Sequence, residues 1–269
     1  MRLKKHIMDK LPINDIDSYY VVADFDRTIT SGNSETSWSV ISMCSGIPEN
    51  YIDERQKLYD IYRPIEIDEN MDFDERSRLV SEWYRKLIEL FIKYQISDKV
   101  FEETANDLGI IKFREGALEF LTFLYDMNIP LIIISAGIGN FIESFLRNNN
   151  CLFDNIYISS NKIIFKNGAA DSIENNLIHS LNKNEISLPN GVAKKLIGRS
   201  KVLLLGDQLS DLNMVDDKMH DEVIRIGFYS TSAQVPIEYY YDKFDIVCDD
   251  KEDNYHSLKK VLFKKDIRN

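Results

Sequence analysis

The sequence predicts an α/β fold, in which a Rossmann-like parallel sheet forms the core and an α-helical cap is inserted between the first and second core strands. Apolar runs of strand length alternate with amphipathic stretches of helical length along the 269 residues, a pattern typical of βαβ units. About a hundred residues separate the first two runs, far more than the dozen or so that one crossover needs. The first run also leads directly into Asp24-Phe25-Asp26-Arg27-Thr28, so two carboxylates emerge at one strand end.

Six apolar runs are interpreted as core strands, because parallel strands that are buried on both faces read as continuous apolar sequence. They are Tyr19 to Ala23, Leu131 to Ile134, Asn155 to Ile158, Val202 to Leu205, Val223 to Ile226 and Asp245 to Cys248. The amphipathic stretches between them are expected to cover both faces of the sheet. A second interpretation stays open for Ile156 to Ser159 and Lys162 to Phe165, namely a small hairpin that turns at Ser160-Asn161.

The insertion after the first strand has a helical pattern. Apolar residues recur at helical spacing through Tyr51 to Ile61, Leu79 to Ile96 and Val100 to Leu108, while alternating β-branched runs are missing. We therefore expect a catalytic core made of residues 1–33 and 111–269 and a helical cap made of residues 34–110. Such a cap would lie over the sheet edge from which the two carboxylates emerge.

Composition limits the partners and the compartment. Acidic residues outnumber basic ones 44 to 33, and the net charge of −11 argues against a nucleic acid polymer or an anionic membrane surface as partner. Cys44, Cys151 and Cys248 are far apart and lack a Cys-x-x-Cys pairing, which argues against a disulfide framework and a zinc site. Because no signal-peptide pattern or apolar stretch of transmembrane length is present, we expect a cytoplasmic protein. The oligomeric state stays open, and a monomer is compatible with the sequence.

Polar residues follow the predicted strands at the edge where ligands bind in open α/β sheets. Asp24 and Asp26 follow the first strand, and two bare carboxylates at one strand end need a cation. Ser135 and Ala136 follow the second strand, where a hydroxyl and backbone amides at a helix start can hold a phosphate. A plain strand-to-helix turn with a serine cap explains Ser135 as well.

Asp207 and Asp211 follow the strand Val202 to Leu205 and lie one helical turn apart if a helix begins there. Both could face the same site, although an aspartate N-cap would explain the pattern too. Lys183 precedes that strand, and taken alone it would be a solvated surface charge.

Together, these acids, the hydroxyl, the lysine and the second pair of acids occur in the order of the four motifs of the haloacid dehalogenase-like (HAD-like) phosphatases, which the chain resembles. The chemistry explains these residue types, because a carboxylate nucleophile accepts the phosphoryl group and a second carboxyl protonates the leaving oxygen. The resemblance implies that Asp24 forms an aspartyl-phosphate and that Asp26 acts as general acid and then as general base. Lys183 and Ser135 would stabilise the transferring oxygens, and Thr28 would support the turn.

The same resemblance implies a Mg²⁺ ion, which would neutralise the crowded charge. Its expected ligands are the Asp24 carboxylate, the Asp26 backbone carbonyl and Asp207. Asp211 is expected to hold either a metal-bound water or Lys183.

The chain more closely resembles the pyrimidine 5′-nucleotidases, the cytosolic type III nucleotidases. The similar segments are Ser135-Ala136-Gly137-Ile138-Gly139, Leu177 to Lys183, Gly206 to Met214 and, in the cap, Tyr62 to Asp68 and Glu82-Trp83-Tyr84. This resemblance covers most of the chain from Tyr19 to Cys248. It implies that the substrates are nucleoside 5′-monophosphates, with pyrimidine nucleotides such as UMP and CMP first among them.

For the cap, the resemblance implies that Glu66 reads the nucleobase, whereas composition alone would make it an exposed helix-end acid. Trp38, Trp83 and Tyr84 are candidates for stacking on the base, with core packing as the alternative. The stretch from Ser34 through Ile47 departs from the eukaryotic members, and Leu87 stands where those members have a serine that contacts the nucleotide. His179 either shuttles protons or orders the loop that carries the catalytic lysine.

Two other functions stay open. The same chemistry would serve a small phosphomonoester such as phosphoserine, since helical caps at this position occur in that class too. A phosphate- or nucleotide-binding regulator on the same fold would normally lack a catalytic carboxylate, and none is missing here.

Overall fold

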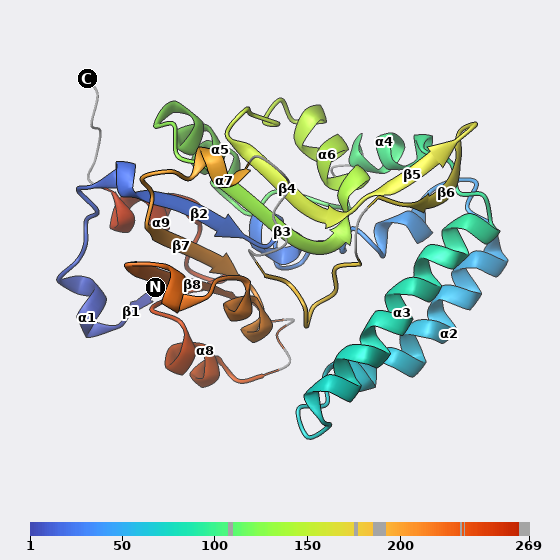
Figure 1. Ribbon diagram of the computed structural model, residues 1–269, viewed down its shortest axis with the longest axis horizontal. Helices are drawn as coiled ribbons and strands as arrows, with labels where there is room; N and C mark the ends of the chain where they lie inside the picture. The colour runs from blue at the N-terminus through green and yellow to red at the C-terminus, as the bar shows by residue number, and fades with distance from the viewer. Residues whose placement is uncertain (107–109, 175–176, 185–191, 232, 234, 264–269) are drawn as a thin grey trace.

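A seven-stranded sheet forms the centre of the computed structural model, which describes residues 1–106, 110–174, 177–184, 192–231, 233 and 235–263 (Figure 1). The strand order is β1-β9-β8-β7-β2-β3-β4. The strands are β1 (Arg2–Leu3), β2 (Tyr19–Ala23), β3 (Leu131–Ile138), β4 (Ile156–Asn161), β7 (Lys201–Gly206), β8 (Glu222–Tyr229) and β9 (Ile246–Asp249). All neighbours are parallel except β1 and β9, so the predicted α/β fold is confirmed.

All six predicted core strands are present, with ends that differ by up to four residues. The additional edge strand β1 has two residues, too few for any periodicity to predict. The alternative hairpin through Ser160-Asn161 is wrong, because both residues belong to β4, which pairs with β3. The hairpin observed joins β5 (Ile163–Lys166) to β6 (Ala169–Ile173) through Asn167 and Gly168, with φ angles of 54° and 79°. Asn-Gly is the stronger hairpin signal, since both residues tolerate positive φ.

Helices cover both faces of the sheet, as the alternation of side chains along β2 requires. Val21 and Ala23 belong to the core that includes α5 (Ala117–Asp126), α6 (Gly139–Asn148) and α9 (Tyr255–Leu262). Tyr20 and Val22 point to the opposite face, where they pack with α7 (Val192–Lys195) and the 3₁₀ helix η5 (Leu209–Met214). Every residue of β2 is buried, which fixes the position of the carboxylates that follow it.

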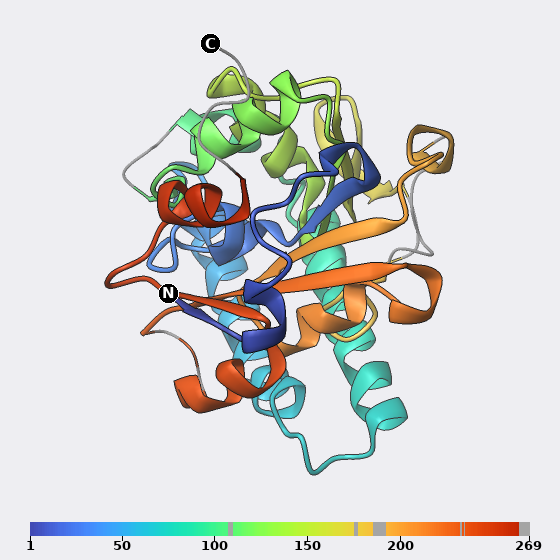
Figure 2. The same cartoon turned by 90° about the vertical axis from the view of Figure 1, so that its left-hand side faces the viewer.

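Three helices occupy the insertion between β2 and β3: α2 (Glu49–Glu66), α3 (Phe73–Lys93) and α4 (Lys99–Asn106). Helices α2 and α3 form a long pair beside the sheet (Figures 1 and 2). Asp72 caps α3, and its side chain accepts hydrogen bonds from the amides of Asp74 and Glu75 at 3.1 Å. The predicted helical stretch Val100 to Leu108 agrees with α4, but its end lies outside the described residues.

The β5–β6 hairpin joins the inserted helices although it comes later in the chain. The Ala170 amide donates to the Ile96 carbonyl at 3.0 Å, and Ser97 forms an isolated bridge with Ala169. Helix α4 in turn packs against α6 of the core. The insertion is therefore held to the core by segments on both sides of residue 110.

Short helices complete the described chain. They are α1 (Lys5–Met8), η1 (Ile16–Ser18), η2 (Phe25–Ile29), η3 (Val40–Met43), η6 (Asp217–Met219) and α8 (Ile237–Lys243). Helix α8 packs on the sheet edge through Tyr240 and Phe244, next to Val247 of β9. Within the described ranges, none of the helices combines the length and the apolar character needed to cross a membrane.

Candidate active site

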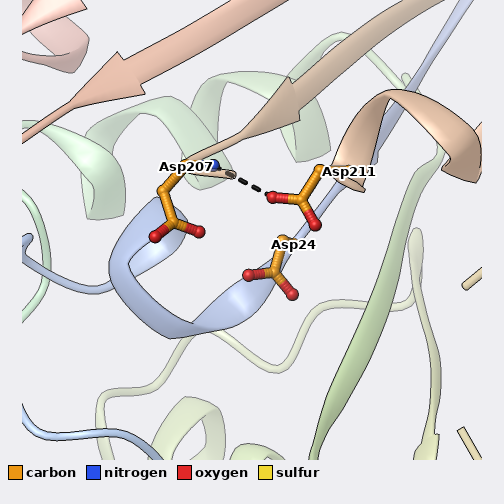
Figure 3. Close-up of side chains that lie close together, drawn as sticks. All are labelled: Asp24, Asp207 and Asp211. Atoms are coloured by element: carbon orange, nitrogen blue, oxygen red, sulfur yellow. Dashed lines mark hydrogen bonds between the residues drawn. The ribbon is translucent and has the colours of Figure 1, made fainter. Parts of the chain in front are cut away.

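Three aspartates meet where β2 and β7 end (Figure 3). One carboxylate oxygen each from Asp24, Asp207 and Asp211 lies within 4.8 Å of the others. Asp24 and Asp211 are almost fully buried, with 3% and 0% of their surface exposed. Ionised carboxylates at this separation repel one another, so the cluster needs positive charge.

Lys183 supplies one such charge. Its ammonium group donates to Oδ1 of Asp24 at 2.7 Å and to Oδ1 of Asp211 at 3.0 Å. Burial disfavours the charged amine, but attraction to these two carboxylates outweighs burial and raises the pKa of Lys183. Lys183 is therefore not the solvated surface charge that it would be if taken alone, because it is buried between two acids.

The remaining negative charge fits a hard cation. Burial, followed by repulsion from Asp211, raises the pKa of Asp207 to about 7. Burial also raises the pKa of Asp24, despite the opposing pull of Lys183. Carboxylate oxygens are the donors that Mg²⁺ prefers in proteins, and a bound cation would favour the ionised form of both groups. Asp24 and Asp207 therefore suit a magnesium ion.

Asp211 has partners for both of its oxygens. Its Oδ2 accepts a hydrogen bond from the Asp207 amide at 3.1 Å (Figure 3). The same oxygen accepts from the Gln208 amide at 2.9 Å, while Oδ1 accepts from Lys183. The alternative of an aspartate N-cap is wrong, because Gln208 is the N-cap of η5 and Asp211 is the third residue of that helix. Asp211 thus fixes the loop that carries Asp207 and also holds the lysine.

The turn after Asp24 is held by residues from three places in the chain. Arg27 has a φ of 62°, and its amide donates to Thr30 Oγ1 at 2.7 Å. The guanidinium of Arg114 donates to the carbonyls of Thr28, at 3.1 Å, and Arg27, and it forms an ion pair with Asp250. Sequence reasoning missed Arg114, because an arginine without motif context carries no signal.

Thr28 also reaches the aspartate cluster. Its hydroxyl donates to Oδ1 of Asp207 at 3.4 Å, and it is completely buried. The hydroxyl of Tyr255 donates to the Thr28 carbonyl at 3.3 Å. Thr28 therefore links the turn after β2 to the loop after β7.

Asp26 is held by a residue that sequence reasoning did not single out. Its two carboxylate oxygens accept hydrogen bonds from the Ser37 amide at 2.9 Å and the Ser37 hydroxyl at 2.7 Å. Burial raises the pKa of Asp26, and the hydrogen bonds from Ser37 oppose that shift. A partly buried carboxyl with a raised pKa is suited to proton transfer near neutral pH.

Ser135 and Ala136 lie within an irregular end of β3, where the register with β4 shifts. The Ser135 hydroxyl accepts a hydrogen bond from the Gly137 amide at 3.0 Å. The Ala136 carbonyl accepts from Asn161 Nδ2 at 2.8 Å and from Trp38 Nε1 at 2.9 Å. The helix α6 begins later than expected, at Gly139, so Ser135 is not its cap.

A cavity of about 470 Å³ joins these core residues to the insertion. This volume is in the range of small-molecule sites, roughly 300 to 1,000 Å³. Asp24, Asp26 and Lys183 line it from the core, and Glu66, Tyr84 and Leu87 line it from α2 and α3.

Glu66 lies at the end of α2 with 8% of its surface exposed, so the expectation of an exposed acid from composition is wrong. Its Oε1 accepts a hydrogen bond from the Ser180 hydroxyl at 2.5 Å, and Arg63 pairs with its Oε2. Ser180 lies three residues before Lys183, so Glu66 touches the segment that carries the lysine.

The three candidate stacking residues line the cavity and also contact other aromatic rings. Trp83 stacks on Tyr62 with the rings 6.2 Å apart and 7° from parallel. Tyr84 meets Trp38 edge to face at 5.6 Å. All three are at least nine-tenths buried. Core packing and cavity lining therefore coexist at Trp38, Trp83 and Tyr84.

His179 is buried behind the lysine segment and is in contact with the insertion. Its Nε2 lies 2.8 Å from the Ser81 hydroxyl of α3, and its Nδ1 accepts from the Leu181 amide at 3.3 Å. Burial lowers the pKa of His179 to about 4. A neutral His179 with hydrogen bonds at both ring nitrogens orders the loop that carries Lys183, which is the second of the two roles expected from the sequence.

His179 makes the stability of the protein depend on pH. Because the folded pKa lies below the ordinary value of 6.5, protons bind the unfolded chain first as the pH falls. The free energy of unfolding is expected to lose about 1 kcal/mol per pH unit between pH 6.5 and 4 from this group, and nothing above pH 7. Urea unfolding at pH 5 and 7 measures the effect.

The variant His179→Gln should lose this part of the pH dependence, whereas His256→Gln, at an exposed histidine, should keep it. Comparing variants removes the opposite contributions of Asp24 and Asp207, whose raised pKa values are common to all three proteins. Identical pH profiles for His179→Gln and the unaltered protein would contradict the assignment.

Comparison with known families agrees with this geometry. A profile of the family described as pyrimidine 5′-nucleotidase (UMPH-1) matches residues 24–262. The chain belongs to the pyrimidine 5′-nucleotidase family. This family member is therefore a hydrolase of the 5′-nucleotidase class.

Curated relatives match over most of their length. The 7-methylguanosine phosphate-specific 5′-nucleotidase of Drosophila melanogaster is 30% identical over 92% of this chain and 80% of its own. The human protein of the same name is 33% identical over 88% of this chain and 81% of its own.

Solved structures place the fold. Cytosolic 5′-nucleotidase IIIB bound to cytidine superposes with a TM-score of 0.82 and 30% identity, over 93% of this chain and 88% of that one. A substrate-bound phosphoserine phosphatase superposes with a TM-score of 0.54 and 17% identity, over 90% and 96% of the two chains. The similarity to phosphoserine phosphatase supports only the fold, and both solved structures share the HAD-like fold with this chain.

Proposed function

We propose that this nucleotidase is a Mg²⁺-dependent phosphomonoesterase that hydrolyses nucleoside 5′-monophosphates, with pyrimidine nucleotides such as UMP and CMP preferred. The main support is that Lys183 bridges Asp24 and Asp211 beside Asp207, and that the cavity at Asp24 extends to Glu66. The end of the cavity at Asp24 and Lys183 suits a phosphate group, and the carboxylate of Glu66 at the other end suits the hydrogen-bond donors of a nucleobase. A nucleotide carries both groups.

Asp24 is the nucleophile in this proposal. Lys183 holds its Oδ1, which leaves Oδ2 to attack the phosphorus atom while the bond to the ribose oxygen breaks. Asp26 gives its proton to that oxygen and then takes one from the water that hydrolyses the aspartyl-phosphate, which restores Asp24. Lys183 and Ser135 would bind the phosphoryl oxygens. Mg²⁺, held by Asp24, the Asp26 carbonyl and Asp207, would stabilise the charge on those oxygens.

Residues 34–110 are proposed to act as the specificity cap over the core made of residues 1–33 and 111–269. Glu66 would accept hydrogen bonds from the nucleobase, and Trp38, Trp83 or Tyr84 would offer an aromatic face. Support comes from the cavity, which these residues line opposite the aspartates.

A second candidate substrate is 7-methylguanosine monophosphate. The curated relatives carry that specificity in their names. A methylated, cationic base also suits a cavity with aromatic walls and a carboxylate, since cations are attracted to aromatic faces.

We also propose a cytoplasmic enzyme whose partner is a small nucleotide. A relative from Caenorhabditis elegans is named a putative cytosolic 5′-nucleotidase 3, and the three cysteines are free thiols. The net charge of −11 disfavours a nucleic acid polymer as substrate.

The proposal is tested by phosphate release from UMP, CMP, 7-methylguanosine monophosphate and phosphoserine, with Mg²⁺ and after its removal by EDTA. Turnover of at least one nucleotide should exceed turnover of phosphoserine by tenfold or more and should return when Mg²⁺ is restored. Faster hydrolysis of phosphoserine would instead favour the small-phosphomonoester alternative. Tight nucleotide binding without turnover would point to a regulator.

Glu66→Gln is expected to change the order of preference among nucleotides by about tenfold, because a hydrogen bond to a charged group is worth roughly 1.5 to 3 kcal/mol. The rate on phosphoserine should change less than about twofold. The matched control is Glu82→Gln on α3, a glutamate that bonds Tyr62 and Lys86 outside the cavity lining. Unchanged relative rates in Glu66→Gln would refute base reading by this residue.

A further inference from the structure

Arg27 follows Asp24 and Asp26 in the turn after β2 and lines the same cavity, and its backbone is fixed on both sides. Its amide donates to Thr30 Oγ1 and its carbonyl accepts from Arg114. Its φ of 62° lies in the left-handed region, which is unfavourable for a residue with a side chain. These contacts hold the backbone in this conformation and place the side chain among the residues that line the cavity.

The guanidinium of Arg27 has one buried donor, its Nε, without a hydrogen-bond partner in the described part of the chain. None of the ion pairs within that part of the chain includes Arg27, although its charge attracts the carboxylates of Asp26 and Asp207. Two other arginines near the site differ, since Arg63 pairs with Glu66 and Arg114 pairs with Asp250. A buried donor without a partner is costly, and a ligand that accepts its hydrogen bonds would remove that cost.

A phosphate that enters this site meets an excess of negative charge. Asp24, Asp207 and Asp211 outnumber the single ammonium of Lys183, which is already shared between two of them. A phosphate dianion that enters such a site needs more positive charge than Lys183 supplies. Guanidinium groups match phosphate oxygens with two parallel hydrogen bonds.

We propose that Arg27 is a further substrate-binding residue, whose guanidinium donates to the phosphoryl oxygens of the bound nucleotide. This inference rests on the proposed function, because it assigns Arg27 to the phosphate end of the same cavity. Arg27 differs from Lys183 in that its buried Nε has no hydrogen-bond partner among the described residues, whereas the ammonium of Lys183 already bonds two carboxylates.

Arg27→Met tests the inference through binding as well as turnover. The dissociation constant of inorganic phosphate, measured by calorimetry with Mg²⁺ present, is expected to rise at least tenfold, and KM for UMP should rise with it. The affinity for uncharged cytidine should stay within twofold, which also reports an intact cavity. Arg27→Lys should recover part of the phosphate affinity, because it retains charge without the planar fork.

The matched control is Arg85→Met, which removes the same charge from an exposed position on α3 and should leave phosphate affinity unchanged. Phosphate affinity within twofold of the unaltered protein in Arg27→Met would overturn the inference. An equal loss of cytidine and phosphate binding would overturn it too, since Arg27 would then support the cavity in general. If the unaltered protein neither binds phosphate nor hydrolyses nucleotides, the proposed function itself fails.

Discussion

Asp24→Asn is expected to lower phosphate release from nucleoside monophosphates by a factor of about 10⁴ or more, because an amide cannot accept the phosphoryl group. The variant should still fold, since Lys183 keeps its contact with Asp211 and one repelling charge is removed from the cluster. Phosphate release and the thermal midpoint are measured on the same preparation. Intact mass must exclude conversion of the new asparagine to aspartate, which would restore activity.

The matched control is Asp53→Asn, at an exposed position on α2. It should retain the full rate. Full activity in Asp24→Asn would sink the aspartyl-phosphate mechanism, whereas loss of activity together with loss of folding would call for Asp24→Ser as a second variant. A folded but inactive protein in either case supports Asp24 as the nucleophile.

Arg114→Met is expected to lower the free energy of unfolding by about 3 kcal/mol, because it leaves the carboxylate of Asp250 without its ion pair. The carbonyls of Arg27 and Thr28 also lose their donor, so the turn after Asp24 should loosen and kcat should fall. Urea unfolding measures the first effect, and phosphate release well below the unfolding midpoint measures the second.

Arg199 offers a comparison at the opposite end of β2. Its guanidinium donates to the carbonyls of Tyr19 at 2.6 Å and Asn128 at 2.9 Å, away from the aspartates. Arg199→Met should lower stability while kcat stays near its normal value. If Arg114→Met lost neither stability nor kcat, the role of Arg114 in holding the turn would be wrong.

The core strands and the polar residues that follow them could be predicted because each depends on local sequence. A buried parallel strand such as β2 needs a continuous apolar run, and the residues after it must emerge at the sheet edge. Asp24 and Asp207 come from distant segments, yet both follow parallel strands of one sheet, so their proximity followed from the strand assignment. The place of Lys183 beside them followed only from the family resemblance.

The supporting residues could not be predicted, because their roles depend on contacts between segments far apart in the chain. Ser37 resembles any loop serine until the chain folds back and its hydroxyl reaches Asp26. Arg114 and Asp250 are 136 positions apart, and neither has a pattern around it. The β5–β6 hairpin differs, because Asn167-Gly168 is a local turn signal and a stronger one than Ser160-Asn161.

The short segment from Leu177 to Lys183 limits how freely this enzyme could exchange its substrate preference with relatives. Within these seven residues, His179 is hydrogen-bonded to Ser81 of α3 and Ser180 donates a hydrogen bond to Glu66. Lys183, at the end of the segment, donates to Asp24. A chimaera that exchanges residues 34–110 alone would replace Ser81 and Glu66, the partners of His179 and Ser180. The position of the Lys183 amine would then change as well. Grafts of the helices should therefore succeed only when they carry residues 177–183 along with them.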